Sequence, residues 1–345
     1  MTGPGTDLAW LADLGWSAFF QDQVDPAEAD LMPVRIASVH RSRLTGVAPD
    51  GRFRLTLPPQ VATTDFAVGD WVLVDPDTQT LVRRLDRRSV LDRHTAGARV
   101  PQLIAANLDT LFIVTSCNAD FNPARLERYL ALANEAGTVP VIVLTKIDTV
   151  ADLSEFTDQA AALQRDLAVV GLNARSPDAV EVLARWCGPG QTVALIGSSG
   201  VGKSTLLNTL AGQDYEDRQA TGAIREDDAK GRHTTTARSL HAIAGGGWVI
   251  DTPGMRTLHV SDLSFGIESL FAEITELAPN CRFRDCTHAH EPGCAVQAAV
   301  SAGGLDPARL SRWRKLHEEN RDNTPVVSGP RGKGPRGKGP RGKKR

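Results

Sequence analysis

The stretch Gly197-Ser-Ser-Gly-Val-Gly-Lys-Ser204 decides the fold. It follows a short apolar run, residues 192–196, and leads into a second apolar segment that begins at Thr205. This glycine, lysine and serine spacing is typical of a loop between a strand and a helix, where backbone N–H groups surround a phosphate. In such a loop Lys203 reaches the outer phosphates of a nucleotide and the Ser204 hydroxyl binds magnesium. The stretch therefore predicts a nucleotide site in an α/β domain.

Apolar runs and helical segments alternate around this loop, which is the pattern of a mostly parallel sheet covered by helices. The predicted strands are residues 111–115, 139–144, 168–172, 192–196 and 248–250. Asn122 followed by Pro123 predicts the start of one helix, and Gly137 its end. Further helices are expected over residues 262–278 and from Asp306-Pro307 onward. We predict an α/β fold.

The second half of a magnesium site is expected in Trp248-Val-Ile-Asp-Thr-Pro-Gly254. A strand that ends in Asp251 places a carboxylate in the magnesium shell, and the Gly254 amide can meet a γ-phosphate. Between the two motifs, Gly231-Arg-His-Thr-Thr-Thr236 offers hydroxyls for a loop that senses this phosphate. The magnesium ligands are predicted to be Ser204, Asp251 and Thr235, with Thr234 and Thr236 as open alternatives.

The segment Thr145-Lys-Ile-Asp148 follows a strongly apolar strand and suits guanine recognition. A carboxylate at Asp148 can accept hydrogen bonds from guanine N1–H and the exocyclic amine, while the Lys146 stem covers the base. An enzyme that uses ATP would not need Asp148. The predicted nucleotide-binding residues are Thr145, Lys146, Ile147, Asp148, Gly197, Ser198, Ser199, Gly200, Val201, Gly202, Lys203, Ser204 and Thr205.

Three of the five cysteines, Cys281, Cys286 and Cys294, lie close together in the sequence with His288. Three thiolates and one imidazole form a complete tetrahedral set for structural zinc, with no open position for a catalytic water. His290 is an alternative fourth ligand. The metal would supply much of the folding free energy of this short polar segment.

Residues 35–86 contain several short strand patterns between glycine and proline breaks, which suggests a small β-barrel. Basic side chains crowd its exit: Arg83, Arg84, Arg87, Arg88, Arg93, His94 and Arg99. They form either a nucleic-acid face or ordinary solvated positions, and the sequence leaves both interpretations open.

The composition is that of a globular chain: 345 residues, 41% hydrophobic and 23% charged. No apolar run is long enough to span a bilayer, and residues 1–16 lack the pattern of a secretory signal, so we expect a cytoplasmic protein without membrane contact. The net charge of −2 hides a segregated tail, because residues 328–345 hold eight Lys or Arg and no acid. This repeated Gly-Pro-Arg-Gly-Lys tail is expected to be disordered and either to bind RNA or to act as a solubiliser.

The combination of motifs resembles the ribosome small-subunit-dependent GTPase A family, RsgA, from about Arg35 to Asn320. The order of motifs is circularly permuted, since the base-recognition segment precedes the phosphate loop. The resemblance implies a GTPase that binds the small (30S) ribosomal subunit and its 16S rRNA, assists late maturation, and hydrolyses GTP to GDP and phosphate with stimulation by the subunit. It also implies a cytoplasmic monomer with one structural zinc, and magnesium with GTP.

The expected organisation is a lead-in over residues 1–32, an RNA-binding OB-fold over 33–92, a permuted GTPase domain over 100–260, a helical zinc domain over 261–325 and the basic tail over 326–345. Two positions depart from the family pattern. Thr145 replaces the Asn of Asn-Lys-x-Asp, which implies a looser tie between this loop and the phosphate loop. Asn173-Ala174 stands where the family has Ser-Ala.

Hydrolysis needs a water in line with the γ-phosphorus. Met255 stands where Ras-like enzymes carry the glutamine that orients this water, so the isolated protein is expected to be slow until the subunit orders the loop. The predicted catalytic residues are Lys203, Asp251 and His233, with Arg232 as an alternative to His233. A purely structural RNA-binding factor would not need Lys203, Asp148 and Asp251 together.

Overall fold

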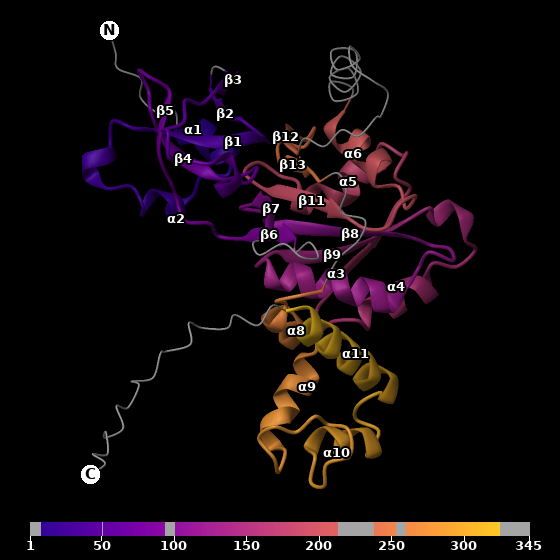
Figure 1. The fold of residues 1–345 in the computed structure, drawn as a ribbon. Coiled ribbons are helices and arrows are strands. Elements are labelled where there is room, and N and C mark those ends of the chain that lie inside the picture. The colour runs from indigo at the N-terminus through magenta and orange to yellow at the C-terminus, as the bar shows by residue number, and fades with distance from the viewer. Residues whose placement is uncertain (1–7, 50, 94–100, 213–237, 253–259, 325–345) are drawn as a thin grey trace, which may run out of the picture.

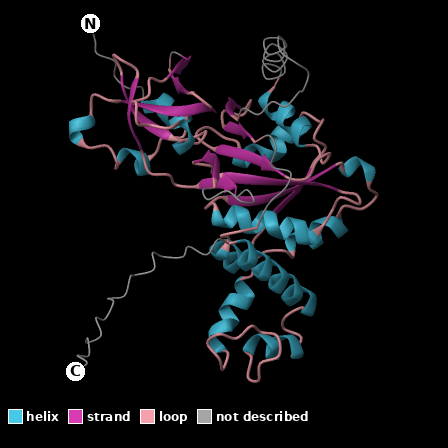
Figure 2. Cartoon of the chain, viewed as in Figure 1, coloured by secondary structure: helices cyan, strands magenta, loops and turns pink. Residues whose placement is uncertain are grey.

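The computed structural model describes residues 8–49, 51–93, 101–212, 238–252 and 260–324. Within these ranges one sheet follows the strand path β10-β9-β8-β11-β13-β12-β1-β2-β3, and β4 and β5 branch from β1. A separate hairpin pairs β6 (Val90–Arg93) with β7 (Gln102–Ala106). The strands occupy the N-terminal and central parts of the molecule, while the C-terminal part is helical (Figure 2).

The central part of the sheet is parallel and has the strand of the phosphate loop near its middle. Its parallel strands are β8 (Thr110–Ser116), β9 (Val139–Thr145), β10 (Ala168–Gly171), β11 (Thr192–Ile196) and β13 (Trp248–Asp251). Antiparallel β12 (Ser239–Ala242) lies beside β13. The five predicted strands are confirmed, whereas β12, β6 and β7 were not predicted.

Helices cover both faces of this sheet (Figure 1). On one face lie α3 (Pro123–Glu135) and α4 (Ser154–Ala161), and on the other α5 (Asp178–Leu183) and α6 (Lys203–Ala211). All residues of β8 are buried, as expected for a parallel strand covered on both sides. Side chains from alternating positions of the strands contribute to two separate apolar clusters. The α/β prediction is confirmed.

The order of the strands in the sheet differs from their order in the chain around β11. Strand β11 lies between β8 and β13 in the sheet. The strands on its β8 side, β8, β9 and β10, precede it in the chain. On its other side the next two strands, β13 and β12, follow it, and β1, β2 and β3 beyond them precede it. The predicted base-recognition segment therefore reaches the phosphate loop from an earlier part of the chain.

The first five strands form a closed ring: β1 (Met32–His40), β2 (Arg43–Ala48), β3 (Gly51–Arg54), β4 (Trp71–Asp75) and β5 (Thr80–Arg84). Strand β1 pairs with β2 and β4, β2 with β3, and β4 with β5. A bridge between Thr56 and Thr80 closes the circuit, and the Leu81 N–H donates to the Thr56 carbonyl at 2.9 Å. The ring encloses an apolar cluster that includes Val34, Leu44 and Val72.

A buried arginine connects this ring to its neighbours. Arg35 is 1% exposed, and its guanidinium donates to the carbonyls of Leu14 at 2.5 Å, Gly69 at 3.4 Å and Asn107 at 3.2 Å. Burial lowers the pKa of Arg35 to about 10, so the group remains charged at neutral pH. The segment containing Leu14 connects α1 (Leu8–Asp13) to α2 (Ala18–Gln21) and is thereby fixed between ring and sheet.

The C-terminal helices are α8 (Ser264–Leu270), α9 (Ala272–Leu277), α10 (Ala295–Ser301) and α11 (Pro307–Asn323). They lie below α3 in Figure 1, and α8 packs so tightly on α3 that a Cβ at Gly266 would fall 2.0 Å from the Ala131 carbonyl oxygen. The buried Glu127 carboxylate of α3 accepts hydrogen bonds from Arg309 Nη1 at 2.8 Å and Arg312 Nε at 2.7 Å. A buried ionic contact thus joins the sheet domain to α11.

The predicted helix starts are confirmed by their caps. The Asn122 side chain accepts from the Arg125 N–H at 3.0 Å, and the Asp306 side chain accepts from the Ala308 N–H at 2.9 Å. The helical segment predicted over 262–278 is interrupted at Phe271, whose ψ of 47° is not helical. Among the described helices, none is both long and apolar enough to span a membrane.

Candidate functional site

The phosphate loop has a backbone that glycine makes possible. Gly197, Gly200 and Gly202 have φ angles of 143°, 81° and 101°, in the region that other residues rarely adopt. A Cβ at Gly197 would also lie 2.2 Å from the Val114 carbonyl oxygen of β8. The loop is therefore fixed both by its own backbone and by the adjacent strand.

Lys203 and Ser204 begin helix α6 directly after the loop. The Lys203 ammonium donates to the carbonyl of Gly197 at 2.8 Å and to that of Ser198, so it lies across the loop. Ser204 is exposed at the positive end of the helix dipole, where anions are stabilised. This arrangement suits a nucleotide phosphate with a hydroxyl available for a cation.

Thr145 ties the base-recognition loop to the phosphate loop. Its hydroxyl is buried and lies 2.5 Å from the Val201 carbonyl oxygen and 3.2 Å from that of Thr115. A Cβ on Gly202 would lie 3.7 Å from the Thr145 hydroxyl and 3.8 Å from the Ala174 Cβ. The threonine hydroxyl therefore does join the two loops, because β9 approaches the phosphate loop closely enough for a short side chain to reach.

Beyond Thr145 the base-recognition segment turns outward. Lys146 has a φ of 57°, and the turn is closed by the Thr149 hydroxyl, which donates to the Lys146 carbonyl at 2.7 Å. Asp148 is exposed and its carboxylate is accessible to a ligand. The Ala174 carbonyl accepts from the Thr209 hydroxyl of α6 at 2.7 Å, so the neighbouring loop is attached to the same helix.

Asp251 ends β13, beside the strand that carries the phosphate loop. The next residue, Thr252, is buried, and its hydroxyl donates to the Leu195 carbonyl of β11 at 2.9 Å. This bond fixes the exit of β13 against β11. The ends of β9, β11 and β13 therefore bring the base-recognition, phosphate and acidic elements to one edge of the sheet.

Two residues at this edge were missed by the sequence analysis. Arg125 Nη1 donates to the Ser198 hydroxyl of the phosphate loop. The Tyr129 hydroxyl also hydrogen-bonds Ser198, while burial raises the pKa of Tyr129. Arg125 and Tyr129 both follow the predicted helix start at Asn122 and lie one helical turn apart. Their spacing in the sequence therefore indicated that they share one face of the helix.

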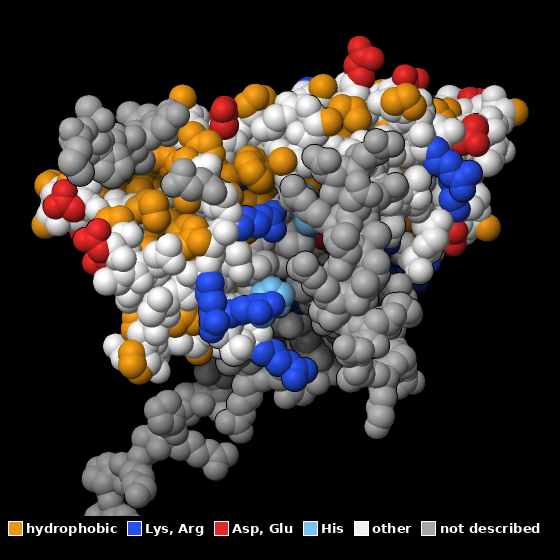
Figure 3. Space-filling model, turned by 90° about the horizontal axis from the view of Figure 1, so that it is seen from above, with side chains coloured by type: hydrophobic (Ala, Val, Ile, Leu, Met, Phe, Trp, Pro, Cys, Tyr) orange, Lys and Arg blue, Asp and Glu red, His pale blue; other side chains and the backbone are white. Residues whose placement is uncertain are grey.

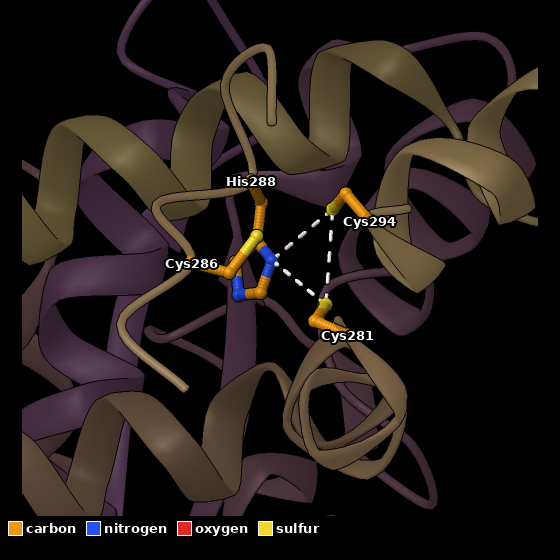
Figure 4. Close-up of side chains that lie close together, drawn as sticks. All are labelled: Cys281, Cys286, His288 and Cys294. Atoms are coloured by element: carbon orange, nitrogen blue, oxygen red, sulfur yellow. Dashed lines mark hydrogen bonds between the residues drawn. The ribbon is translucent and has the colours of Figure 1, made fainter. Parts of the chain in front are cut away.

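The sulfur and nitrogen ligands predicted from the C-terminal segment do converge. The side chains of Cys281, Cys286, His288 and Cys294 point toward one another, with all ligand atoms within 4.8 Å (Figure 4). His288 is buried and belongs to this cluster, whereas His290 is exposed, which decides between the two candidates. Burial lowers the pKa of His288 and favours the neutral ring that a metal ligand requires.

The spacing of these atoms fits zinc. Cys281 Sγ lies 3.8 Å from Cys294 Sγ, and His288 Nδ1 lies 3.5 and 3.4 Å from these two sulfurs. Ligands at about 2.3 Å (sulfur) and about 2.1 Å (nitrogen) in a tetrahedron would be about 3.8 Å and about 3.6 Å apart. The donor set and its geometry therefore suit a closed structural site.

The loop that carries His288 is also held by its own hydrogen bonds. The Glu291 carboxylate accepts from the backbone N–H groups of Thr287 and Ala289, both at 2.9 Å. Hydrogen bonds from the Thr287 hydroxyl and from backbone N–H groups hold the pKa of Glu291 well below its ordinary value. The loop remains closed around a charged carboxylate at neutral pH.

Comparison with known proteins gives the family of this chain. The RsgA GTPase family matches residues 84–261, which include the phosphate loop, the base-recognition segment and Asp251. A "Small ribosomal subunit biogenesis GTPase RsgA" from Mesorhizobium japonicum is 71% identical over 322 residues, covering 93% of each chain. This chain belongs to the RsgA GTPase family. Members are GTP hydrolases, so this chain is a GTPase.

Other RsgA relatives give the same picture. "Small ribosomal subunit biogenesis GTPase RsgA 2" from Vibrio vulnificus is 48% identical over 94% of this chain and 91% of its own. Crystal structures of YjeQ from Thermotoga maritima and of YloQ, a circularly permuted GTPase, each give a TM-score of 0.61. They share 24% and 23% identity, cover 84% and 88% of this chain, and are themselves covered over 98% and 99%. The permuted fold is therefore shared with both.

Several residues with predicted functional roles lie outside the described residues. These are His233, Thr235 and their neighbours Arg232, Thr234 and Thr236, together with Gly254, Met255, His94 and Arg99. Their predicted roles stay predictions.

Three of the arginines predicted as a possible nucleic-acid face form ion pairs within the molecule. Arg83 pairs with Glu28 at 2.6 Å, and Arg87 with the fully buried Asp70 at 2.6 Å. Arg88 pairs with Asp109. Their charges are engaged within the molecule, which favours the structural interpretation for these three.

Proposed function

We propose that this chain is a guanine-nucleotide-dependent factor of small ribosomal subunit biogenesis, which binds GTP at the phosphate loop and hydrolyses it to GDP and phosphate. The observation that carries the proposal is the bond from Thr145 to Val201. It joins the loop that bears Asp148 to the loop that bears Lys203. One bound nucleotide can then contact both residues, with its base at one and its phosphates at the other.

At the phosphate end each residue has a distinct part. Lys203 and the loop N–H groups bind the β- and γ-phosphates. Ser204 and Asp251 offer oxygen ligands of the kind that magnesium prefers, and Thr235 is the proposed third protein ligand. Magnesium supplies charge neutralisation at the phosphates. Asp251 is held in place by the neighbouring bond from Thr252 to Leu195.

At the base end, Asp148 accepts hydrogen bonds from guanine, which adenine cannot donate in the same pattern. The stem of Lys146 covers the base, and residues 145–148 and 197–205 form the complete nucleotide site. The exposed position of Asp148 supports this assignment, since a ligand can reach it.

The proposed organisation is an N-terminal lead-in (1–32), an OB-fold (33–92), a permuted GTPase domain (100–260), a helical zinc domain (261–325) and a basic tail (326–345). The closed strand ring supports the second assignment, and the Cys281–Cys294 cluster supports the fourth. One structural zinc would be bound by Cys281, Cys286, His288 and Cys294, and it would stabilise the domain without taking part in hydrolysis.

The proposed partner is the small ribosomal subunit, bound through its 16S rRNA by a cytoplasmic monomer. The relatives' names support the subunit as partner. The face seen in Figure 3 presents Lys and Arg side chains, which are suited to contacts with RNA phosphates. The tail, with eight Lys or Arg in residues 328–345, would add salt-dependent affinity for RNA.

The proposed stimulation of GTP hydrolysis by the subunit depends on which residue orients the attacking water. Met255 cannot orient a water as glutamine does, so His233 or Arg232 is proposed to act once the subunit orders the segment. The test measures GTP turnover with and without purified small subunits. Faster turnover with subunits supports the proposal, and equal rates refute stimulation. Calorimetry with GTP and ATP checks the guanine site, and equal affinities would refute the role of Asp148.

A further inference from the structure

Ser198, the second residue of the phosphate loop, is held from two sides. Its carbonyl accepts from Lys203 Nζ, which belongs to the nucleotide site itself. Its hydroxyl is contacted by Arg125 Nη1 and hydrogen-bonds Tyr129, both from helix α3 outside the loop. A positive charge on α3 therefore contacts the loop that encloses the phosphates.

The same helix is bound to the C-terminal helices by charged contacts. The Glu127 carboxylate pairs with Arg309 and Arg312, and Arg128 Nη2 lies 2.6 Å from Glu319 Oε2. Glu127 and Arg309 have side-chain exposures of only 3% and 8%, so this pair is shielded from solvent screening. Helix α3 thus contacts the phosphate loop through Arg125 and Tyr129 and contacts α11 through several charged pairs.

A third contact extends this connection along α3. The Gly266 N–H of α8 donates to Glu135 Oε2, at the last turn of α3, at 2.7 Å. Together with the close approach of Gly266 to Ala131, this leaves no room for α8 to slide on α3. A displacement of α3 must therefore move α8 and α11 as well, because packed interfaces change between discrete arrangements and do not deform continuously.

We propose that Arg125 is a positioning residue of the phosphate loop and that it couples nucleotide occupancy to the C-terminal helices through α3. The inference rests on the proposed binding of a guanine nucleotide at this loop. A bound phosphate fixes the backbone of Ser198 and adds negative charge near the Arg125 guanidinium, so the contact differs between empty and occupied states. Only such a difference can shift the position of α3. By reciprocity, the C-terminal contacts influence nucleotide affinity.

The test uses the full-length, zinc-loaded chain and follows hydrogen exchange in α11 with and without saturating GDP. Arg125→Ala removes the charge, and Ser198→Ala removes the same contact from the loop side. Arg125→Lys keeps the charge. The matched control is Arg165→Ala, since Arg165 forms an exposed ion pair with Glu276 at 3.0 Å between the same two parts of the molecule but does not touch the loop.

We expect GDP to change exchange in α11 of the unmodified chain and of Arg165→Ala, and to leave it unchanged in Arg125→Ala and Ser198→Ala. GDP affinity should fall about tenfold in Arg125→Ala, as for a lost charge-assisted hydrogen bond, with partial recovery in Arg125→Lys. Zinc content and circular dichroism confirm folding of each variant.

The inference is overturned if α11 responds to GDP equally in Arg125→Ala and the unmodified chain, or in neither. It is also overturned if Arg165→Ala loses the response as Arg125→Ala does. Failure of the unmodified chain to bind GDP would instead refute the proposed function, so the two outcomes are distinguished by the binding measurement.

Discussion

The bond between Thr145 and Val201 gives the most direct test of how the nucleotide site is assembled. Thr145→Val keeps the shape of the side chain and replaces the hydroxyl by a methyl group. Thr145 is 1% exposed, so no bulk water replaces the lost donor. The Val201 carbonyl then loses the partner that lies 2.5 Å away, and the two loops lose their hydrogen bond.

The size of the effect follows from the chemistry of the lost donor. The hydroxyl has one hydrogen, so it can serve either Val201 or the more distant Thr115 carbonyl, and a single bond is lost. Leaving a buried acceptor unpaired costs about 1–3 kcal/mol. If about half of this cost falls on the geometry of the phosphate loop, GDP affinity decreases by roughly twofold to twelvefold, since a tenfold change corresponds to about 1.4 kcal/mol.

Isothermal titration calorimetry with GDP and urea unfolding measure the two parts of this cost. Thr145→Ser is the control, because it keeps the donor and removes only the methyl group. We expect the serine variant to bind GDP more tightly than the valine variant. The reasoning is refuted if Thr145→Val binds GDP like the unmodified chain, or if the serine variant is the weaker of the two.

Three other changes test the C-terminal contacts. Glu127→Ala leaves the buried Arg309 charge without one of its two carboxylate partners and should lower the free energy of unfolding by about 3 kcal/mol, measured by urea denaturation; a loss below about 1 kcal/mol would contradict the importance of this pair. Cys294→Ser should abolish stoichiometric zinc, measured by elemental analysis, and reduce the helical circular dichroism of the C-terminal part; full zinc occupancy would exclude Cys294 as a ligand. Burial raises the pKa of Glu135, so this group favours folding at low pH and its contribution falls as pH rises through the folded pKa. Glu135→Gln keeps an acceptor for the Gly266 N–H. Because glutamine does not titrate, the variant should gain stability over the unmodified chain at pH 7 but not at pH 4, which thermal unfolding at the two pH values checks. An equal difference between the two proteins at both pH values would contradict the raised pKa of Glu135.

The elements that could be predicted from the sequence are those fixed by local patterns. The phosphate loop could be predicted from the spacing of its glycines, because its three positive φ angles need residues without a Cβ. The apolar runs of the parallel strands were readable because both faces of the sheet are covered. The cysteine and histidine ligands lie in one short segment, so their chemistry was visible without knowledge of the fold.

The contacts that could not be predicted join distant parts of the chain. Whether Thr145 reaches Val201 depends on how closely β9 and the loop approach, which is set by packing of the sheet. The pairs of Arg87 with Asp70 and of Glu127 with Arg309 likewise depend on the tertiary arrangement. A run of arginines is the same sequence whether its charges face solvent or a carboxylate, so only the structure separates the two.

The strand order has a consequence for how the protein is made. Translation proceeds from the N-terminus at about 5–20 residues per second, so Asp148 emerges from the ribosome before Lys203, and Asp251 last. Strand β11 can then pair with β8, which is already synthesised, whereas its pairing with β13 must wait until residues 248–251 are made. With the proposed site, a nascent chain acquires its purine-recognition loop well before it can hold a triphosphate, so nucleotide capture belongs to the late stage of its own synthesis.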